Sequence, residues 1–69
     1  MKKEVIIQNR NISITLFFSD EEKRQEMKKA INNCLENEKE YPTINYTDSK
    51  ENLIFPATFL KNSLIKFPL

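Results

Sequence analysis

The clearest pattern of hydrophobic and polar residues lies between Asn11 and Phe18, where apolar and polar positions alternate. The apolar side of this alternation consists of Ile12, Ile14, Leu16 and Phe18. A period of two is typical of a β-strand with one buried face. A shorter apolar run within residues 3–8 predicts a strand just before it. The chain is therefore expected to begin with two adjacent strands.

The short connection between these strands favours a tight hairpin. A two-residue turn at Asn9-Arg10 sets Ile7 opposite Ile12 and Val5 opposite Ile14, which lines one face with aliphatic pairs. A three-residue turn would set polar or charged side chains against aliphatic ones. Asparagine tolerates the left-handed backbone conformation that such turns require. The two-residue register is therefore the prediction.

A helix is predicted to begin at Ser19 and to end near residues 37–39. Ser19 and Glu22 match a capping box, and the early acidic residues suit the positive end of the helix dipole. Pro42 blocks any continuation of the helix. One narrow stripe of the helix is apolar and should face the sheet: Met27, Ala30, Ile31, Cys34 and Leu35.

Two further strands are predicted on either side of a polar turn at residues 48–51. Alternation in both segments predicts a hairpin that pairs Tyr46 with Leu53 and Ile44 with Phe55. This register points the large apolar side chains of both strands to one face.

Pro56 should end the fourth strand and start a short helical turn at Ala57–Asn62. Ser63–Phe67 then forms a last short strand. The order β-β-α-β-β with a short final strand predicts an α+β fold: a small antiparallel sheet with one helix packed on one face. Residues 1–69 are expected to form a single domain.

Several residue types needed for catalysis are rare or missing. The 69-residue chain has no histidine, no glycine and one cysteine. Without histidine, the Ser-His-Asp and Cys-His catalytic arrangements are excluded. Without glycine, the glycine-rich phosphate-binding loops are excluded. We therefore expect no catalytic residues, no metal site and no cofactor, and we expect Cys34 to be a buried structural thiol.

The charge of the chain narrows the classes of partner. The net charge is +1 and 30% of the residues are charged, whereas a nucleic-acid-binding domain of this size is usually far more basic. The basic residues at the start of the helix offer an alternative function, a small nucleic-acid-associated regulator: Lys23, Arg24, Lys28 and Lys29. No apolar stretch is long enough for a membrane span or a signal peptide, which predicts a cytoplasmic protein with no membrane partner.

The apolar residues that one helix cannot cover indicate a contact surface. The predicted helix-facing side of the sheet holds Val5, Ile7, Ile12, Ile14, Leu16, Phe18, Ile44, Tyr46, Leu53 and Phe55. The opposite side holds Ile6, Phe17 and Ile54, joined by Phe67 or Leu64 depending on the register of the last strand. An exposed patch that contains an aromatic ring is a candidate association surface. An edge strand and the acidic region at residues 36–51 are the alternative contact sites.

A chain this short buries only about 60% of its unfolded surface, so a partner or a second copy is expected to add stability. The lack of glycine and the many Lys, Asn, Ile and Glu residues are typical of AT-rich bacterial, phage and plasmid genomes. Together these observations predict a non-enzymatic protein-binding module, homodimeric, in the form of a phage- or plasmid-encoded inhibitor that acts by steric occlusion of a host or defence protein.

Overall fold

The structure, a computed structural model, describes residues 3–69 and has an α+β fold. Five strands and two helices follow one another in the order β1 (Glu4–Asn9), β2 (Ile12–Phe17), α1 (Glu21–Glu36), β3 (Thr43–Thr47), β4 (Asn52–Pro56), α2 (Ala57–Lys61) and β5 (Leu64–Lys66). Every predicted element is present and the class of fold is confirmed.

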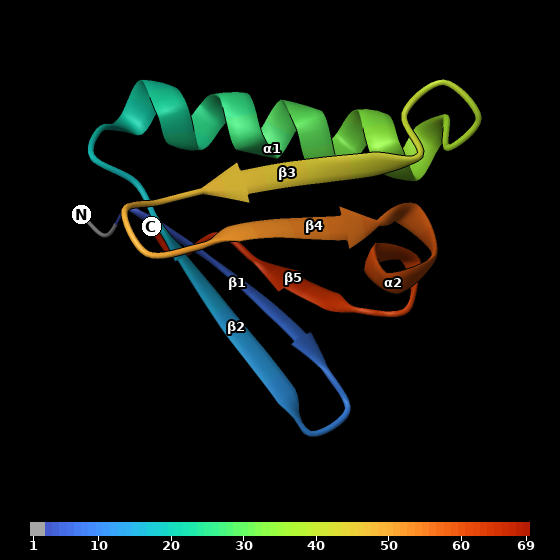
Figure 1. The fold of residues 1–69 in the computed structure, drawn as a ribbon, viewed down its shortest axis with the longest axis horizontal. Coiled ribbons are helices and arrows are strands. Elements are labelled where there is room, and N and C mark those ends of the chain that lie inside the picture. The colour runs from blue at the N-terminus through green and yellow to red at the C-terminus, as the bar shows by residue number, and fades with distance from the viewer. Residues whose placement is uncertain (1–2) are drawn as a thin grey trace.

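The five strands form two antiparallel sheets rather than one. One sheet has the order β2-β1-β5 and the other is the β3-β4 hairpin. Figure 1 shows α1 lying along β3, with β4 between β3 and the three-stranded sheet. The first and last strands of the chain are neighbours, so β1 is the central strand of its sheet.

The register of the first hairpin differs from the prediction by two residues. The turn lies at residues 10 and 11, so Asn9 is opposite Ile12, and Ile7 is opposite Ile14. Arg10 has a φ of 54°, the left-handed conformation that had been assigned to asparagine. A shift of two keeps each side chain on its predicted face, because side chains alternate with a period of two.

The register of the second hairpin is confirmed. Tyr46 is opposite Leu53 and Ile44 is opposite Phe55. The turn between the strands is stabilised by Asp48, whose Oδ1 accepts hydrogen bonds of 2.8 Å from two following backbone N–H groups. This side-chain turn, together with the alternation on both sides, leaves one favourable pairing.

Helix α1 begins one residue later than predicted. Asp20, not Ser19, is the N-cap, and its Oδ1 accepts a 2.8 Å hydrogen bond from the Lys23 N–H. Both residue types cap helices well, so the sequence pattern alone does not separate them. The predicted end is confirmed, since the last helical residue is Glu36.

The core lies between the helices and the inner faces of both sheets. Its buried members are Val5, Ile7, Leu16, Ile31, Cys34, Ile44, Tyr46, Phe55, Ala57 and Leu60. Burial of each large aliphatic side chain contributes about 1.5–3 kcal/mol. Ile12 was predicted to belong here but is 53% exposed, because the corrected register places it at the turn end of β2, opposite Asn9.

Candidate protein-binding surface

The outer face of the β2-β1-β5 sheet, turned away from the core, carries a row of apolar side chains. Ile6 lies at the centre of this face, opposite Thr15 on one neighbouring strand and Lys66 on the other. Phe17 and Leu64 occupy the next outward-facing positions, diagonal to Ile6 on either side. Diagonal neighbours on one face of a sheet lie close enough for aromatic and long side chains to touch. We refer to Ile6, Phe17 and Leu64 as the outer-face patch.

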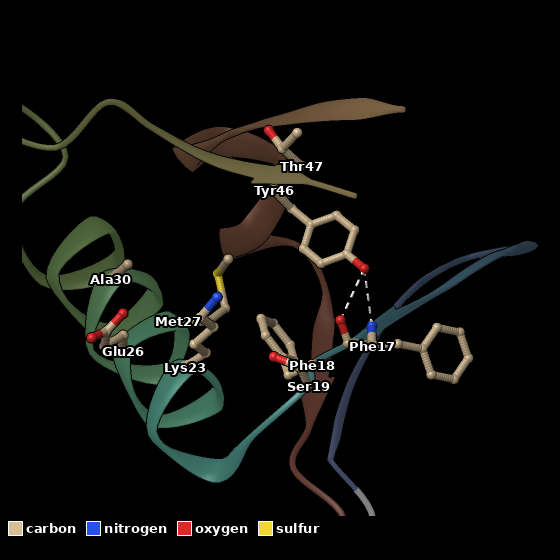
Figure 2. Close-up of a pocket in the computed structure, with 9 residues that line it drawn as sticks. All are labelled: Phe17, Phe18, Ser19, Lys23, Glu26, Met27, Ala30, Tyr46 and Thr47. Carbon is tan, nitrogen blue, oxygen red and sulfur yellow. Dashed lines mark hydrogen bonds between the residues drawn. The ribbon is translucent and has the colours of Figure 1, made fainter. Parts of the chain in front are cut away.

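The patch is open to solvent. Phe17 is 66% exposed and Leu64 is 58% exposed, whereas Ile6 between them is half-buried. In Figure 2 the Phe17 ring points away from the other labelled side chains. The same face carries a charged residue of each sign, Glu4 and Lys66, at its margins. An aromatic ring with aliphatic neighbours and a polar rim is the anatomy of a protein contact surface.

Ile54, which was predicted to share this surface, lies elsewhere. It points outward from β4, in the other sheet, and is 59% exposed. Together with Ile12 it borders an apolar groove of about 330 Å³ between β2, β4 and α2, whose lining includes Phe59. The sequence pattern assigned Ile54 to the correct side of its own hairpin. It did not reveal that this hairpin forms a separate sheet.

Phe67 lies on the inner side of its sheet, away from the outer-face patch. Its side chain packs against the core, with the Arg24 guanidinium 5.9 Å and the Lys28 ammonium 5.4 Å from the ring centroid. Phe67 follows the last strand residue and keeps the alternation of β5, so it lies on the inner side with Ile65, which is opposite the buried Ile7. Of the two predicted candidates, Leu64 is the one on the outer face.

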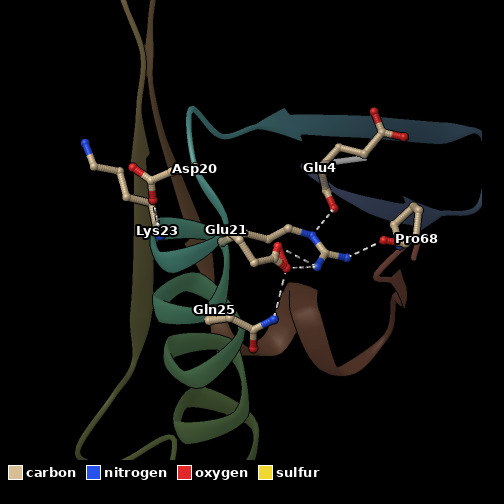
Figure 3. Close-up of polar contacts among 7 residues, drawn as sticks. Glu4, Asp20, Glu21, Lys23, Gln25 and Pro68 are labelled. Atoms are coloured by element: carbon tan, nitrogen blue, oxygen red, sulfur yellow. Dashed lines mark hydrogen bonds and ion pairs between the residues drawn. The ribbon is translucent and has the colours of Figure 1, made fainter. Parts of the chain in front are cut away.

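One of the four residues of the predicted basic face of α1, Arg24, is buried. This residue is 3% exposed and donates to the Glu4 carbonyl at 2.9 Å, to the Pro68 carbonyl at 2.6 Å and to the Glu21 carboxylate at 2.7 Å. Figure 3 shows these contacts at the start of the helix. Lys23, Lys28 and Lys29 are exposed, and the Lys28 ammonium also lies over the Phe67 ring. Arg24 therefore ties both ends of the described chain to α1 and is not available to a phosphate.

The two sheets are joined by one tyrosine. The Tyr46 hydroxyl accepts from the Phe17 N–H at 3.2 Å and donates to the Phe17 carbonyl at 3.0 Å. The Tyr46 ring also makes an edge-to-face contact with Phe18, with centroids 5.7 Å apart. A surface hollow of about 460 Å³ lies beside this junction and is bordered on the helix by Lys23 and Glu26 (Figure 2).

Two acidic residues of the region 36–51 have separate structural contacts. Glu38 pairs with Lys61 at 2.7 Å, and Asp48 caps its own turn. The backbone N–H groups of Lys50 and Glu51 lower the pKa of the Asp48 carboxyl. Among residues 3–69, no three His, Cys, Asp or Glu side chains are grouped so that they could hold a metal ion.

Cys34 is completely buried in the apolar stripe of α1. Burial raises the pKa of its thiol, and the nearby Glu38 carboxylate acts in the same direction. Both effects disfavour the thiolate, which is the nucleophilic form. The side chain fits the structural role expected from the sequence.

Within the described residues, neither helix is long and apolar enough to cross a bilayer. Comparisons with protein-family models, with curated proteins and with solved structures found no match. The surface features themselves are therefore the basis for a functional hypothesis.

Proposed function

We propose that this protein is a non-enzymatic binding module that attaches to another protein through its outer-face patch. The single observation that supports the proposal is the exposure of Phe17 and Leu64 on the uncovered face of a sheet whose other face is already packed. Exposed apolar residues that occur singly are normal, but a row that includes a ring on a flat sheet surface is typical of an interface.

The mode of action that suits these features is steric occlusion. A flat apolar face with a polar rim can cover a functional surface of its partner without any catalytic group. We infer that the partner is a host or defence protein in the bacterial cytoplasm, and that the gene belongs to a phage or plasmid. The AT-rich amino-acid usage supports this part of the proposal.

A nucleic-acid function has less support. Three of the four candidate basic residues, Lys23, Lys28 and Lys29, are exposed, whereas Arg24 is buried and the Lys28 ammonium also lies over the Phe67 ring. Three lysines provide little of the phosphate neutralisation on which nonspecific nucleic-acid binding depends.

The test is a capture experiment with matched variants. The wild-type protein, Phe17→Asp and Tyr41→Asp are immobilised and incubated with a lysate of a low-GC Gram-positive bacterium, with and without nuclease. Tyr41 is the control because it is an exposed aromatic residue, at 45%, outside both sheets. Circular dichroism establishes that each variant is folded.

We expect one dominant protein to be retained by the wild type and by Tyr41→Asp, to be lost from Phe17→Asp, and to be insensitive to nuclease. Leu64→Asp should reproduce the loss, because Leu64 belongs to the same patch. Equal retention by folded Phe17→Asp would contradict the proposed surface. Recovery that disappears with nuclease would favour the nucleic-acid function instead.

A further inference from the structure

The outer edge of β2 presents backbone groups without partners. The N–H and carbonyl groups of Phe17 point away from β1. This direction is evident from their hydrogen bonds, which both go to the Tyr46 hydroxyl. Along a strand of an antiparallel pair, the backbone N–H and carbonyl groups of one residue face the partner strand, and those of the next residue face outward. The same groups of Thr15 and Ser13 therefore face outward, and no residue of the range 3–69 hydrogen-bonds to them there.

This edge also lacks the features that usually protect an edge strand. The sequence of β2 is Ile-Ser-Ile-Thr-Leu-Phe, which contains no charge and no proline, and its register with β1 has no bulge. The other outer strand of the sheet, β5, has only three residues and ends in Lys66. On the second sheet, β4 ends in Pro56. β3, the remaining outer strand, also has no charge and no proline but has five residues against the six of β2.

We infer that a second copy of this chain pairs with β2 in an antiparallel arrangement, across a two-fold axis at Ile14. This inference goes beyond the proposed function, because it names the chain itself as a partner and uses the edge of β2 rather than the outer-face patch. In this register Ser13 of each copy is opposite Thr15 of the other, and the two Ile14 side chains are neighbours. The register leaves Phe17 with its Tyr46 contacts, so neither copy has to open the junction between its sheets.

The charges that flank the strand favour this arrangement. Arg10 precedes β2 and Asp20 follows it. An antiparallel pair of copies brings Arg10 of each copy towards Asp20 of the other, in two symmetric places. A parallel pair would bring like charges together at both ends, which is destabilising. The strand and its flanks are therefore self-complementary in one orientation.

The size of the contact sets the expected strength. Ser13 and Thr15 provide two residues per copy, and hence at most four backbone hydrogen bonds across the axis. Ile12 and Ile14 add apolar contact beside the groove that they border with β4. An interface of this size belongs to the weak class, below about 1,200 Å² of buried surface. We expect a reversible dimer with a dissociation constant in the micromolar range or weaker.

The test uses backbone methylation, which removes one N–H and leaves the side chain unchanged. A chain of 69 residues is accessible to chemical synthesis, and an N-methyl group on Thr15 blocks the edge without altering the ladder to β1. The matched control carries the N-methyl group on Asn45. Asp48 and Glu51 form a hydrogen-bonded pair at the turn, so every second residue of β3 counted from Asp48 bonds to β4. Asn45 is not one of them, and its N–H faces outward. Sedimentation velocity is recorded for each protein over a wide range of concentrations.

We expect the wild type and the Asn45-methylated protein to dimerise equally, and the Thr15-methylated protein to dimerise at least tenfold more weakly. In the wild type, the amide hydrogens of Ser13 and Thr15 should gain protection from exchange as the concentration rises. Arg10→Glu should weaken the dimer several-fold, and Asp20→Asn in the same chain should reverse part of that loss while keeping a helix cap.

A wild type that stays monomeric at millimolar concentration would overturn the inference, as would a Thr15-methylated protein that dimerises normally. Either result leaves the proposed function standing if Phe17→Asp still loses its partner, because the Phe17 ring lies on the outer face and not at the edge. Conversely, a concentration-dependent dimer with no loss of capture by Phe17→Asp supports the edge pairing and refutes the outer-face patch.

Discussion

The Tyr46 hydroxyl holds both the N–H and the carbonyl of Phe17, and so joins two sheets that share no strand pairing. Tyr46→Phe removes both hydrogen bonds but keeps the ring contact with Phe18. We expect a loss of about 1–2 kcal/mol in the free energy of unfolding, measured by urea titration. Tyr41→Phe removes a hydroxyl with no protein hydrogen bond among the described residues and should change stability by less than about 0.5 kcal/mol. Equal effects of the two changes would show that the junction adds no stability.

Arg24→Lys tests the buried guanidinium. Lysine keeps the charge but cannot reach the Glu4 and Pro68 carbonyls together with Glu21, because its single ammonium lacks the planar fork. We expect a loss of about 2–3 kcal/mol in the free energy of unfolding, since buried acceptors lose charged donors. Arg10→Lys, at an exposed position, is the control and should be nearly neutral. A neutral Arg24→Lys would mean that water or another donor replaces these contacts.

Arg10→Gly should stabilise the protein. Arg10 has a φ of 54°, a conformation that costs a residue with a Cβ atom roughly 1–2 kcal/mol and costs glycine little. Part of the gain is offset by the greater freedom of glycine in the unfolded chain, so a net gain of about 0.5–1 kcal/mol is expected. Asn11→Gly is the matched control: Arg10 is the only non-glycine residue with a positive φ in the described chain, so glycine at position 11 should give no gain.

Acid should destabilise the protein in part through Asp48. Its pKa is lowered in the folded state, first by the Lys50 N–H and then by the Glu51 N–H. A lowered folded-state pKa means that stability is fully present above the ordinary value near 3.8 and is lost as the pH falls through the folded value. Asp48→Asn should therefore be less stable than wild type at neutral pH, and the difference should vanish in strong acid.

Urea unfolding at several pH values from neutral to strongly acidic measures this convergence. Glu21 contributes in the same direction, because hydrogen bonds from Gln25 and Arg24 lower the pKa of its carboxyl. Asp48→Asn should still lose some free energy of unfolding as the pH falls. The double variant Asp48→Asn with Glu21→Gln should lose less. A constant difference between wild type and Asp48→Asn at every pH would contradict the assignment.

Cys34 should react with thiol reagents only when the protein unfolds. The side chain is completely buried, and burial raises the pKa of its thiol. We expect labelling by an aromatic disulfide reagent to be slow in the native protein and to accelerate with urea in step with unfolding. Arg24→Lys should speed the labelling, because a lower free energy of unfolding raises the fraction of molecules in which Cys34 is accessible. Rapid labelling of the native wild type would show that α1 opens locally.

The parts of the fold that could be predicted from the sequence are those determined by neighbouring residues. The β3-β4 register follows from alternation and from a turn that Asp48 closes locally, so Tyr46 and Leu53 were paired correctly. The β1-β2 register was wrong by two residues, because Arg10 occupies a left-handed turn position that its residue type does not indicate. The period of two nevertheless preserved the faces, which is why Phe17 was assigned to the exposed side.

The parts that could not be predicted depend on residues far apart in the chain. β5 pairs with β1, and the β3-β4 hairpin pairs with neither β1 nor β2; no local pattern signals either arrangement. The burial of Arg24 depends on carbonyl groups of Glu4 and Pro68, 20 and 44 residues away. In the sequence it resembles any other charged residue in the first turns of a helix. The choice between Leu64 and Phe67 for the outer face also depends on this distant pairing, because the register of β5 with β1 sets which residues of β5 point outward.

The central place of β1 has a consequence for biosynthesis. One of its edges is completed only by β5, and the link between Asn9 and Ser63 spans 54 residues. During translation the first strand therefore leaves the ribosome long before its second neighbour exists. The nascent chain can form the first hairpin and α1 early, but the sheet waits for almost the last codons that encode the described residues. Until then the second edge of β1 is open in addition to the outer edge of β2, which exposes the chain to wrong strand pairing for longest at its first strand.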